Sequence, residues 1–451
     1  MIRKLLSFIF FANLISLYSN SQTHTFQKIY KLSGASIGMA VKELPNQQFF
    51  LGLHYSTIAS LPNRMTLMKV NENGDSLNAK VLCASVTGDF VISNNFNVAI
   101  IGTASSCIPN VQTDIVLYIL DTAFNMLDTA LFGDANLDKG KRIINNSDGS
   151  YTIACYNDSY PDLIKADSAG SIIWSRSYGL SGLYSVKHSL DGGYFICGNA
   201  GGSFVDPMYV AKLDSMGFVI WYKTFYNNNM FIFTDIEPTP DGGVVALCDE
   251  ASLYKISAIG DSLWKKNVYP AYTRITKTTD GNLIMTGAGT GMALVKADTS
   301  GNIIWAKQFS YYPFTPGIWY ESNDVIQTSD GGYMLCGLID SFGVQNLYVV
   351  KTDSLGFVTT GLFEVEKQLL KSYCYPNPMK QTAQITFTDM NLPNLKNNIL
   401  RLYDSRGIQL KEEQVFSWPY TLHRSNMPPG FHFYTISVQK EVISTGKLVM
   451  E

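Results

Sequence analysis

The residue types in this chain that could do chemistry recur at fixed places in a repeated pattern. Aspartate stands before glycine in short segments, as in the DGGY sequences at Asp191–Tyr194 and Asp330–Tyr333. A calcium loop would place several oxygen ligands at alternating positions. Aspartate before glycine is instead typical of a tight turn, where the carboxylate accepts backbone N–H groups and glycine supplies a positive φ. We therefore expect turns, and no metal site, at Asp148, Asp191, Asp241, Asp280 and Asp330.

Lysines and tryptophans recur around a second turn in each copy. The lysines stand two residues before it, and the tryptophans follow its first residue by seven positions. Such regularity indicates ion pairs or a solvated edge for the lysines, and packing between repeats for the indoles. An aromatic cage for sugars or cations is the alternative. The residues are Lys69, Lys165, Lys212, Lys255, Lys296 and Lys351, with Trp174, Trp221, Trp264 and Trp305.

One aromatic segment lies outside the repeat, in the sequence YYPFTPGIWY. We predict a ligand-binding surface there; the alternative is a loop folded over one face of the protein. The residues of this predicted surface are Tyr311, Tyr312, Phe314, Trp319 and Tyr320.

Motifs for catalysis are sparse. The chain has five histidines, and it contains no G-x-S-x-G elbow, HExxH helix or phosphate-cradling loop. We expect no catalytic residue and no cofactor. Two close carboxylates with perturbed pKa values at one end of a channel would favour an enzyme, whereas an uncharged aromatic face would favour binding.

The repeat predicts an all-β fold. Each copy holds four short strands, and seven copies follow one another at a spacing of roughly 47 residues, which is typical of propeller blades. The seventh copy has Thr360 where tryptophan is expected, while Phe26 and Tyr30 reproduce the aromatic spacing of Trp174 and Tyr178. We therefore predict a seven-bladed β-propeller over residues 22–361, in which strand 25–30 closes the last blade and removes exposed edges.

Seven cysteines are present. Four of them, Cys155, Cys197, Cys248 and Cys336, occupy adjacent places in the repeat and are expected to pack between sheets. The pair considered for a disulfide is Cys83 with Cys107.

The repeat resembles the propeller repeats of secreted Bacteroidetes proteins over about residues 25–361, and more distantly those of quinoprotein propellers. This resemblance implies the fold and leaves the function open, because propellers host unrelated activities. The resemblance to quinoprotein dehydrogenases would imply adjacent cysteines beside a cofactor. No two cysteines are adjacent here, which weighs against that activity.

Both ends of the chain indicate export. Arg3 and Lys4 precede an apolar run from Leu5 to Leu17, which predicts a cleaved signal peptide over residues 1–21. A membrane anchor is the alternative, but about 13 residues are too few to span ~30 Å of hydrocarbon. A charged linker over residues 362–373 precedes a last domain over residues 374–451.

The last domain has its own motifs: YPNP, LRLYDSRG, GFHFYTISV and a terminal GKLVME. They resemble the type A C-terminal sorting domain of the type IX secretion system, which implies a small β-sandwich that the type IX translocon recognises. An ordinary immunoglobulin-like domain is the alternative. The motif residues are Pro376, Asn377, Pro378, Gly407, Gly430 and Lys447.

Composition narrows the function further. A net charge of −3 argues against a nucleic-acid footprint, and no later segment reaches membrane length. We predict a secreted or surface-attached propeller that acts as a non-enzymatic binding or scaffold module, with a surface glycan or protein as partner. The alternative is a secreted glycan lyase or hydrolase.

Overall fold

The chain divides into two compact units, Met1–Thr360 and Gly361–Glu451. The computed structural model describes residues 24–32, 34–56, 64–84, 86–104, 114–133, 138–157, 162–179, 182–200, 207–226, 231–268, 272–312, 315–358, 372–387, 398–404, 408–438 and 441–451. The predicted signal peptide and Cys107, Phe314, Thr360 and Gly407 lie outside these ranges, as does nearly all of the predicted linker.

The first unit consists of seven four-stranded antiparallel sheets, numbered here in chain order. Sheet 1 contains β2 (Ala35–Leu44), β3 (Gln48–Ser56), β4 (Arg64–Val70) and β5 (Ser76–Leu82), with a 3-10 turn η1 (Pro45–Gln47); sheet 2 contains β6 (Val86–Ile92), β7 (Val98–Thr103), β8 (Ile115–Leu120) and β9 (Met126–Phe132). Sheet 3 contains β10 (Asp138–Asn145), β11 (Tyr151–Asn157), β12 (Asp162–Ala166) and β13 (Ile172–Ser177); sheet 4 contains β14 (Gly182–His188), β15 (Tyr194–Asn199), β16 (Met208–Leu213) and β17 (Val219–Phe225).

The remaining sheets repeat this order. Sheet 5 contains β18 (Phe233–Pro238), β19 (Val244–Cys248), β20 (Ser252–Ile256) and β21 (Ser262–Asn267). Sheet 6 contains β22 (Tyr272–Lys277), β23 (Leu283–Gly287), β24 (Met292–Ala297) and β25 (Ile303–Phe309). Sheet 7 contains β26 (Ile318–Gln327), β27 (Tyr333–Ser341), β28 (Val344–Thr352) and, as its fourth strand, β1 (Phe26–Tyr30).

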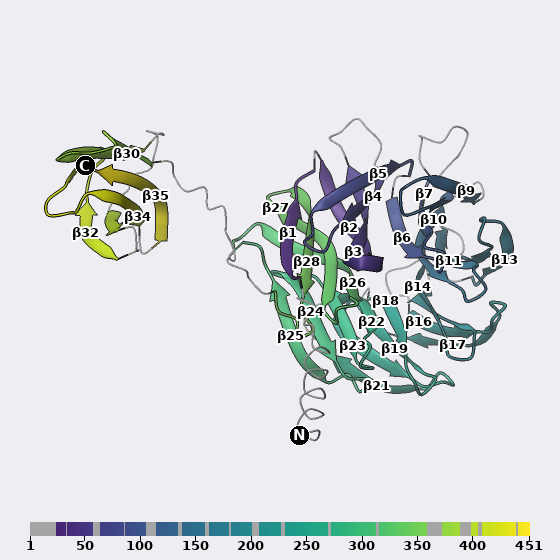
Figure 1. Cartoon of the computed structure of the whole chain (residues 1–451). Helices are drawn as coiled ribbons and strands as arrows, with labels where there is room; N and C mark the ends of the chain where they lie inside the picture. Colours follow the sequence, from purple (N-terminus) through teal and green to yellow (C-terminus); the bar gives the residue numbers. More distant parts are fainter. Residues whose placement is uncertain are drawn as a thin grey trace, which may run out of the picture. The chain divides into compact units, whose positions relative to one another are not determined.

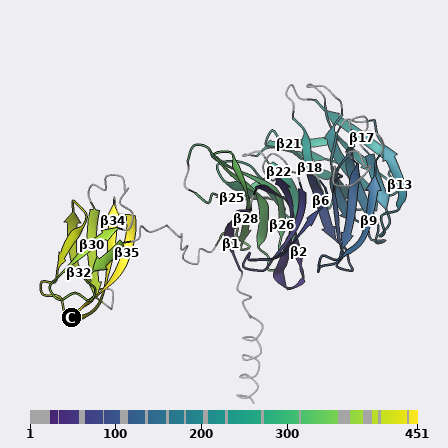
Figure 2. The same ribbon diagram turned by 90° about the horizontal axis from the view of Figure 1, so that it is seen from above.

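The sheets form a closed ring. The first strand of each sheet contacts the first strand of the next, and β26 of sheet 7 contacts β2 of sheet 1. Strand β1 pairs antiparallel with β28, with Phe26 opposite Lys351, which is the pairing expected from the aromatic spacing. Figures 1 and 2 show this purple N-terminal strand beside the green strands of sheet 7. The all-β propeller class predicted from the repeat is therefore confirmed.

The turns explain why aspartate and lysine recur together. In sheet 4, the Asp191 carboxylate accepts the backbone N–H of Gly193 while Gly192 adopts a φ of 87°. Lys212 Nζ lies 2.6 Å from the same carboxylate, and the equivalent pair recurs in sheets 3, 5, 6 and 7. Sheet 1 has Asn46 in its turn, and there Lys69 lies over the ring of Phe50 at 5.9 Å. The predicted turns and structural ion pairs are confirmed in these five sheets.

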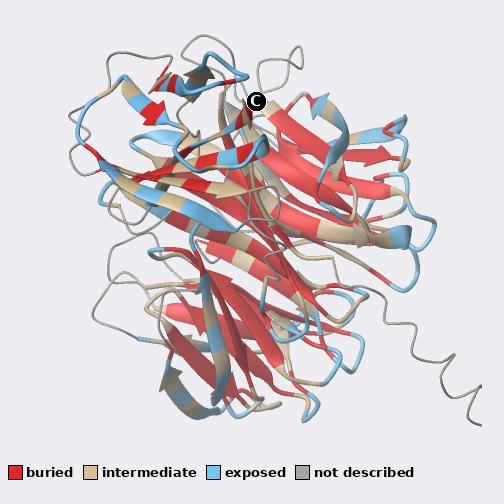
Figure 3. Cartoon of the chain, turned by 60° about the vertical axis from the view of Figure 1, so that its left-hand side comes forward, coloured by how far each residue is buried: buried red, intermediate tan, exposed pale blue. Residues whose placement is uncertain are grey.

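The cores lie between neighbouring sheets, where strand positions are buried, whereas exposed positions gather at turns and outer strands (Figure 3). Each indole packs against a turn glycine of the following sheet; an added Cβ at Gly217 would lie 2.9 Å from Trp174. The four repeat cysteines are buried in these cores. Cys83 is disulfide-bonded, and Cys107, with which a bridge was considered, lies outside the described residues.

The second unit has two sheets. One contains β29 (Ser372–Tyr375), β30 (Thr382–Phe387) and β33 (Tyr420–His423); the other contains β31 (Asn398–Asp404), β32 (Gln409–Val415), β34 (Gly430–Val438) and β35 (Glu441–Met450). Apolar side chains of both sheets form one core, including Ile385 and Leu422 from the first and Leu402 and Ile436 from the second. This is the β-sandwich that the sequence predicts. Within the described part of the chain, no helix has both the length and the apolar character needed to cross a bilayer.

Candidate functional site

The first strand of every propeller sheet contains a β-bulge at an equivalent place, and bulges re-aim side chains. The bulges precede Ala40, Phe90, Arg142, Ser185, Asp235, Arg274 and Asp324. At five of these positions, and close to the other two, a residue has a charged or hydroxyl side chain. These side chains come from different sheets and lie close together near the first strands. Asp235 is fully buried, and Asp89, Arg274 and Asp324 are nearly so.

Six side chains at or near these bulges form an alternating series of opposite charges, which we call the charged ring. Arg274 Nε lies 2.9 Å from Asp324, which lies 3.1 Å from Lys42 Nζ. The longer contacts continue from Lys42 to Asp89 at 3.7 Å, from Asp89 to Arg142 at 3.6 Å, and from Arg142 to Asp235 at 3.8 Å. The members of the charged ring are Lys42, Asp89, Arg142, Asp235, Arg274 and Asp324.

Two hydrogen bonds complete the circle through the remaining sheets. Asp235 accepts the hydroxyl of Ser185 at 2.5 Å and the backbone N–H of Ile275 at 3.1 Å. Sheets 4 and 6 are thereby tied to sheet 5, so the polar contacts connect all seven sheets. Burying a charge is costly unless it is paired, and the three cations here balance the three carboxylates.

The electrostatics of the site follow from burial and pairing. Burial raises the pKa of Asp89, while Lys42 and Arg142 oppose that rise and Asp324 adds to it. Burial lowers the pKa of Lys42, but the carboxylates of Asp324 and Asp89 outweigh it, so its pKa is raised overall. Glu237, paired with Lys187 at 3.1 Å, also has a pKa raised by burial.

Two close carboxylates with a perturbed pKa are the feature that we expected of an enzyme, and Asp89, which burial gives a raised pKa, lies near the carboxylate of Asp324. The cavity beside them is small, about 230 Å³, and its lining includes Lys42, Arg142 and Arg274. Ligand pockets usually measure about 300–1,000 Å³. Each of the two carboxylates also has a cationic partner. The small cavity and the paired carboxylates suit a structural role, in which opposite charges neutralise one another, better than an acid–base pair that is open to a glycan.

The predicted aromatic surface divides into exposed and buried members. Tyr311, Tyr312 and Trp319 are each roughly two-fifths exposed. Tyr320, in contrast, is only 2% exposed, and its hydroxyl accepts the backbone N–H groups of Tyr311 and Tyr312 at 3.0 Å each. Tyr320 therefore anchors the loop and differs from its expected role in ligand contact. A ligand surface at the three exposed residues stays a prediction, and Phe314 lies outside the described residues.

Two of the sorting-motif residues, Asn377 and Lys447, are in contact in the second unit. Asn377 Nδ2 donates to the carbonyl of Lys447 at 3.0 Å, and its Oδ1 accepts the N–H of Val449 at 2.8 Å. Asn377 is flanked by Pro376 and Pro378, and it thus fastens the YPNP segment to the last strand. Gly430 begins β34 with a φ of 129°, a value that favours glycine.

The charged ring was missed by the sequence analysis. Its members differ in residue type from sheet to sheet, because each must complement its neighbours instead of repeating them. The available signal was an Asp, Arg or Ser directly before Ile or Val in the first strand of most copies, as at Arg142, Ser185, Asp235, Arg274 and Asp324.

Comparison with known proteins identifies the second unit. Residues 373–451 match the family described as secretion system C-terminal sorting domain. None of the curated proteins matches the sequence.

Solved structures resemble the chain in fold. BBS1N in complex with ARL6DN is 9% identical with a TM-score of 0.50, covering 73% of this chain and 96% of that one. BamB from Moraxella catarrhalis is 12% identical with a TM-score of 0.43, covering 70% and 85%. The Dos1 propeller is 13% identical with a TM-score of 0.43, covering 72% and 95%. The closed ring of four-stranded sheets and the match at residues 373–451 make this chain a β-propeller protein that carries a type IX C-terminal sorting domain, which directs its export to the cell surface or beyond.

Proposed function

We propose that the exported propeller is a non-enzymatic binding module whose rigid ring presents a recognition surface to a glycan or protein outside the cell. The observation that carries this proposal is the pairing within the charged ring. Every carboxylate of the ring contacts a cation, so the centre of the propeller serves to tie the sheets together.

The second candidate is a glycan lyase or hydrolase that uses the central carboxylates. The raised pKa of Asp89 favours it, because catalytic acids often carry such shifts. The small volume beside Asp89 and its two cationic neighbours weigh against it.

The experiment is to incubate the full-length mature protein with surface polysaccharides and to measure both bound material and new chain ends by mass spectrometry. Binding without new reducing or unsaturated ends is expected. Turnover that disappears in Asp89→Asn, in a variant that still folds, would overturn the binding module in favour of the enzyme.

A further inference from the structure

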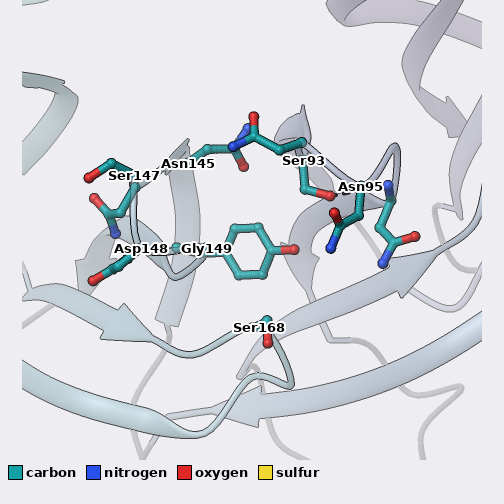
Figure 4. Close-up of a pocket in the computed structure, with 11 residues that line it drawn as sticks. Ser93, Asn95, Asn145, Ser147, Asp148, Gly149 and Ser168 are labelled. Carbon is teal, nitrogen blue, oxygen red and sulfur yellow. Dashed lines mark hydrogen bonds between the residues drawn. The ribbon is translucent and has the colours of Figure 1, made fainter.

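A second cavity, which we call the interblade pocket, lies between sheets 2 and 3. Its volume is about 420 Å³, within the usual range for ligand pockets. The turn between β6 and β7 contributes Ser93 and Asn95, and the turn between β10 and β11 contributes Ser147 and Asp148. Figure 4 shows these two groups on opposite sides of the pocket, with Ser168 on a third.

The interblade pocket lies at an interface that lacks the indole found at the interfaces after sheets 3 to 6. In sheets 3 to 6 the tryptophan pairs in register with the repeated lysine, as Trp221 does with Lys212. At that register sheet 2 has Asp128 opposite Ile119. Trp221 Nε1 donates to the carbonyl of Ala258, the second residue of the following sheet's turn, at 2.9 Å.

The equivalent turn residue in sheet 3 is Ser168, which lines the pocket. Sheet 3 also keeps the other surfaces that contact an indole elsewhere. Gly170, with a φ of 89°, corresponds to the turn glycine Gly217 that packs on Trp174, but here it packs on Ala130 of sheet 2, whose Cβ would lie 2.5 Å from an added Cβ. Tyr151, which lines the pocket, corresponds to Tyr194, whose ring lies 6.2 Å from that of Trp174. Two residues at positions that face an indole elsewhere, Tyr151 and Ser168, thus line the pocket.

The lining determines the chemistry of an occupant. It consists mainly of asparagine amides and serine hydroxyls, which both donate and accept hydrogen bonds. Its carboxylate, Asp148, lies 2.8 Å from Lys165 Nζ and is neutralised by it, so the pocket favours neither a cation nor an anion. The Asn146 amide is already bonded to Ser150, Thr152 and Tyr194, so a ligand would meet the amides of the turn between β6 and β7, such as Asn95.

One lining side chain has an unused acceptor. Asn145 Nδ2 donates to the carbonyl of Ile92 at 2.7 Å, whereas its buried Oδ1 has no partner among the described residues.

We infer that the interblade pocket binds one residue of a neutral glycan, with the sugar ring in the space of the absent indole and its hydroxyls bonded to the surrounding amides. The inference rests on the proposed binding function and names its ligand class and its site.

The test uses the full-length protein on an array of neutral and charged oligosaccharides, followed by calorimetry with the tightest neutral ligand. Asp128→Trp places an indole at the register that sheets 3 to 6 use, and it should abolish binding without lowering the melting temperature. Asp128→Ala is the matched control that leaves the space open, so its affinity should stay unchanged. Asn95→Ala, in an exposed turn, should weaken binding about tenfold.

The outcomes separate the site from the proposed function. Neutral-glycan binding that survives both Asp128→Trp and Asn95→Ala would overturn the pocket while leaving the binding module in place. Preference for charged glycans, or an array with no ligand, would also overturn the pocket. Binding to surface proteins would then decide whether the propeller is a binding module. Should Asp128→Trp fail to fold, the Asn95→Ala result decides.

Discussion

Asp324 of the last propeller sheet accepts a hydrogen bond from Lys42 of the first at 3.1 Å. The same carboxylate accepts the backbone N–H of Val41 at 2.9 Å and pairs with Arg274 of sheet 6 at 2.9 Å. A single buried side chain thus joins the two ends of the ring, alongside the pairing of β1 with β28. Closure therefore depends on charge complementarity as well as on strand pairing.

Replacing Asp324 with alanine should destabilise the protein strongly. The change leaves Lys42 and Arg274 without this partner in a largely buried site, and breaking a buried pair in this way typically costs about 3–5 kcal/mol. Urea denaturation followed by tryptophan fluorescence measures the loss. The control is Asp75→Ala, which removes the exposed contact between Lys28 and Asp75 at the same closure and should cost less than about 1 kcal/mol. Equal losses in the two variants would contradict a special role for the charged ring.

Substituting alanine for each of two glycines that have similar backbone conformations should destabilise the protein by different amounts. Gly192 has a φ of 87° and nothing within 4 Å of an added Cβ, so alanine there meets only backbone strain of about 1 kcal/mol. Gly217 has a φ of 81°, and its added Cβ would also lie 2.9 Å from the Trp174 ring. Gly217→Ala should therefore cost about 1–3 kcal/mol more than Gly192→Ala. Thermal unfolding of the two variants gives the comparison, and equal melting temperatures would count against the indole contact.

Stability should fall in acid because of the turn aspartates. Hydrogen bonds from Lys165 and Lys212 lower the pKa of Asp148 and Asp191 from 3.8 to about 2. A carboxyl whose pKa is lower in the folded protein stabilises it above the unfolded pKa, and this contribution disappears as the pH falls from 4 toward 2. Both side chains are about half exposed, so each contributes less than about 1 kcal/mol. The double variant Asp148→Asn, Asp191→Asn should lose less stability between pH 5 and pH 2, measured by melting temperature; an unchanged slope would argue against these pairs.

Replacing Asn377 with alanine should impair export. The variant loses two hydrogen bonds to the last strand, worth about 2 kcal/mol together, and loosens the YPNP segment from β35. The measurement is the share of protein that reaches the cell surface and medium, compared with the share retained in the periplasm. Gln384→Ala, at an exposed site on β30, serves as the control and should be exported normally. Normal export of Asn377→Ala would show that sorting does not depend on this contact.

Local sequence patterns determined most of the propeller. Turn chemistry at Asp191 and Gly192 acts over a few residues, so the strand boundaries around it can be predicted without a structure. The spacing of Phe26 and Tyr30 likewise indicated the strand that completes sheet 7. The motifs after residue 373 identified the sorting domain because they are contiguous and ordered.

Only the tertiary structure decided which side chains pair at the centre of the propeller and which contacts form between neighbouring sheets. Arg142 and Asp235 belong to different sheets, and they become partners only because the closed ring brings these sheets together. Tyr320 looked like a ligand contact in an aromatic segment, yet packing buries it under its own loop. The interblade pocket lies at the interface where sheet 2 has Asp128 at the indole's register, and such a replacement has a consequence only when the next sheet lies against it. Periodic, short-range interactions can be read from the order of residues, whereas complementarity between distant side chains arises only once folding brings them together.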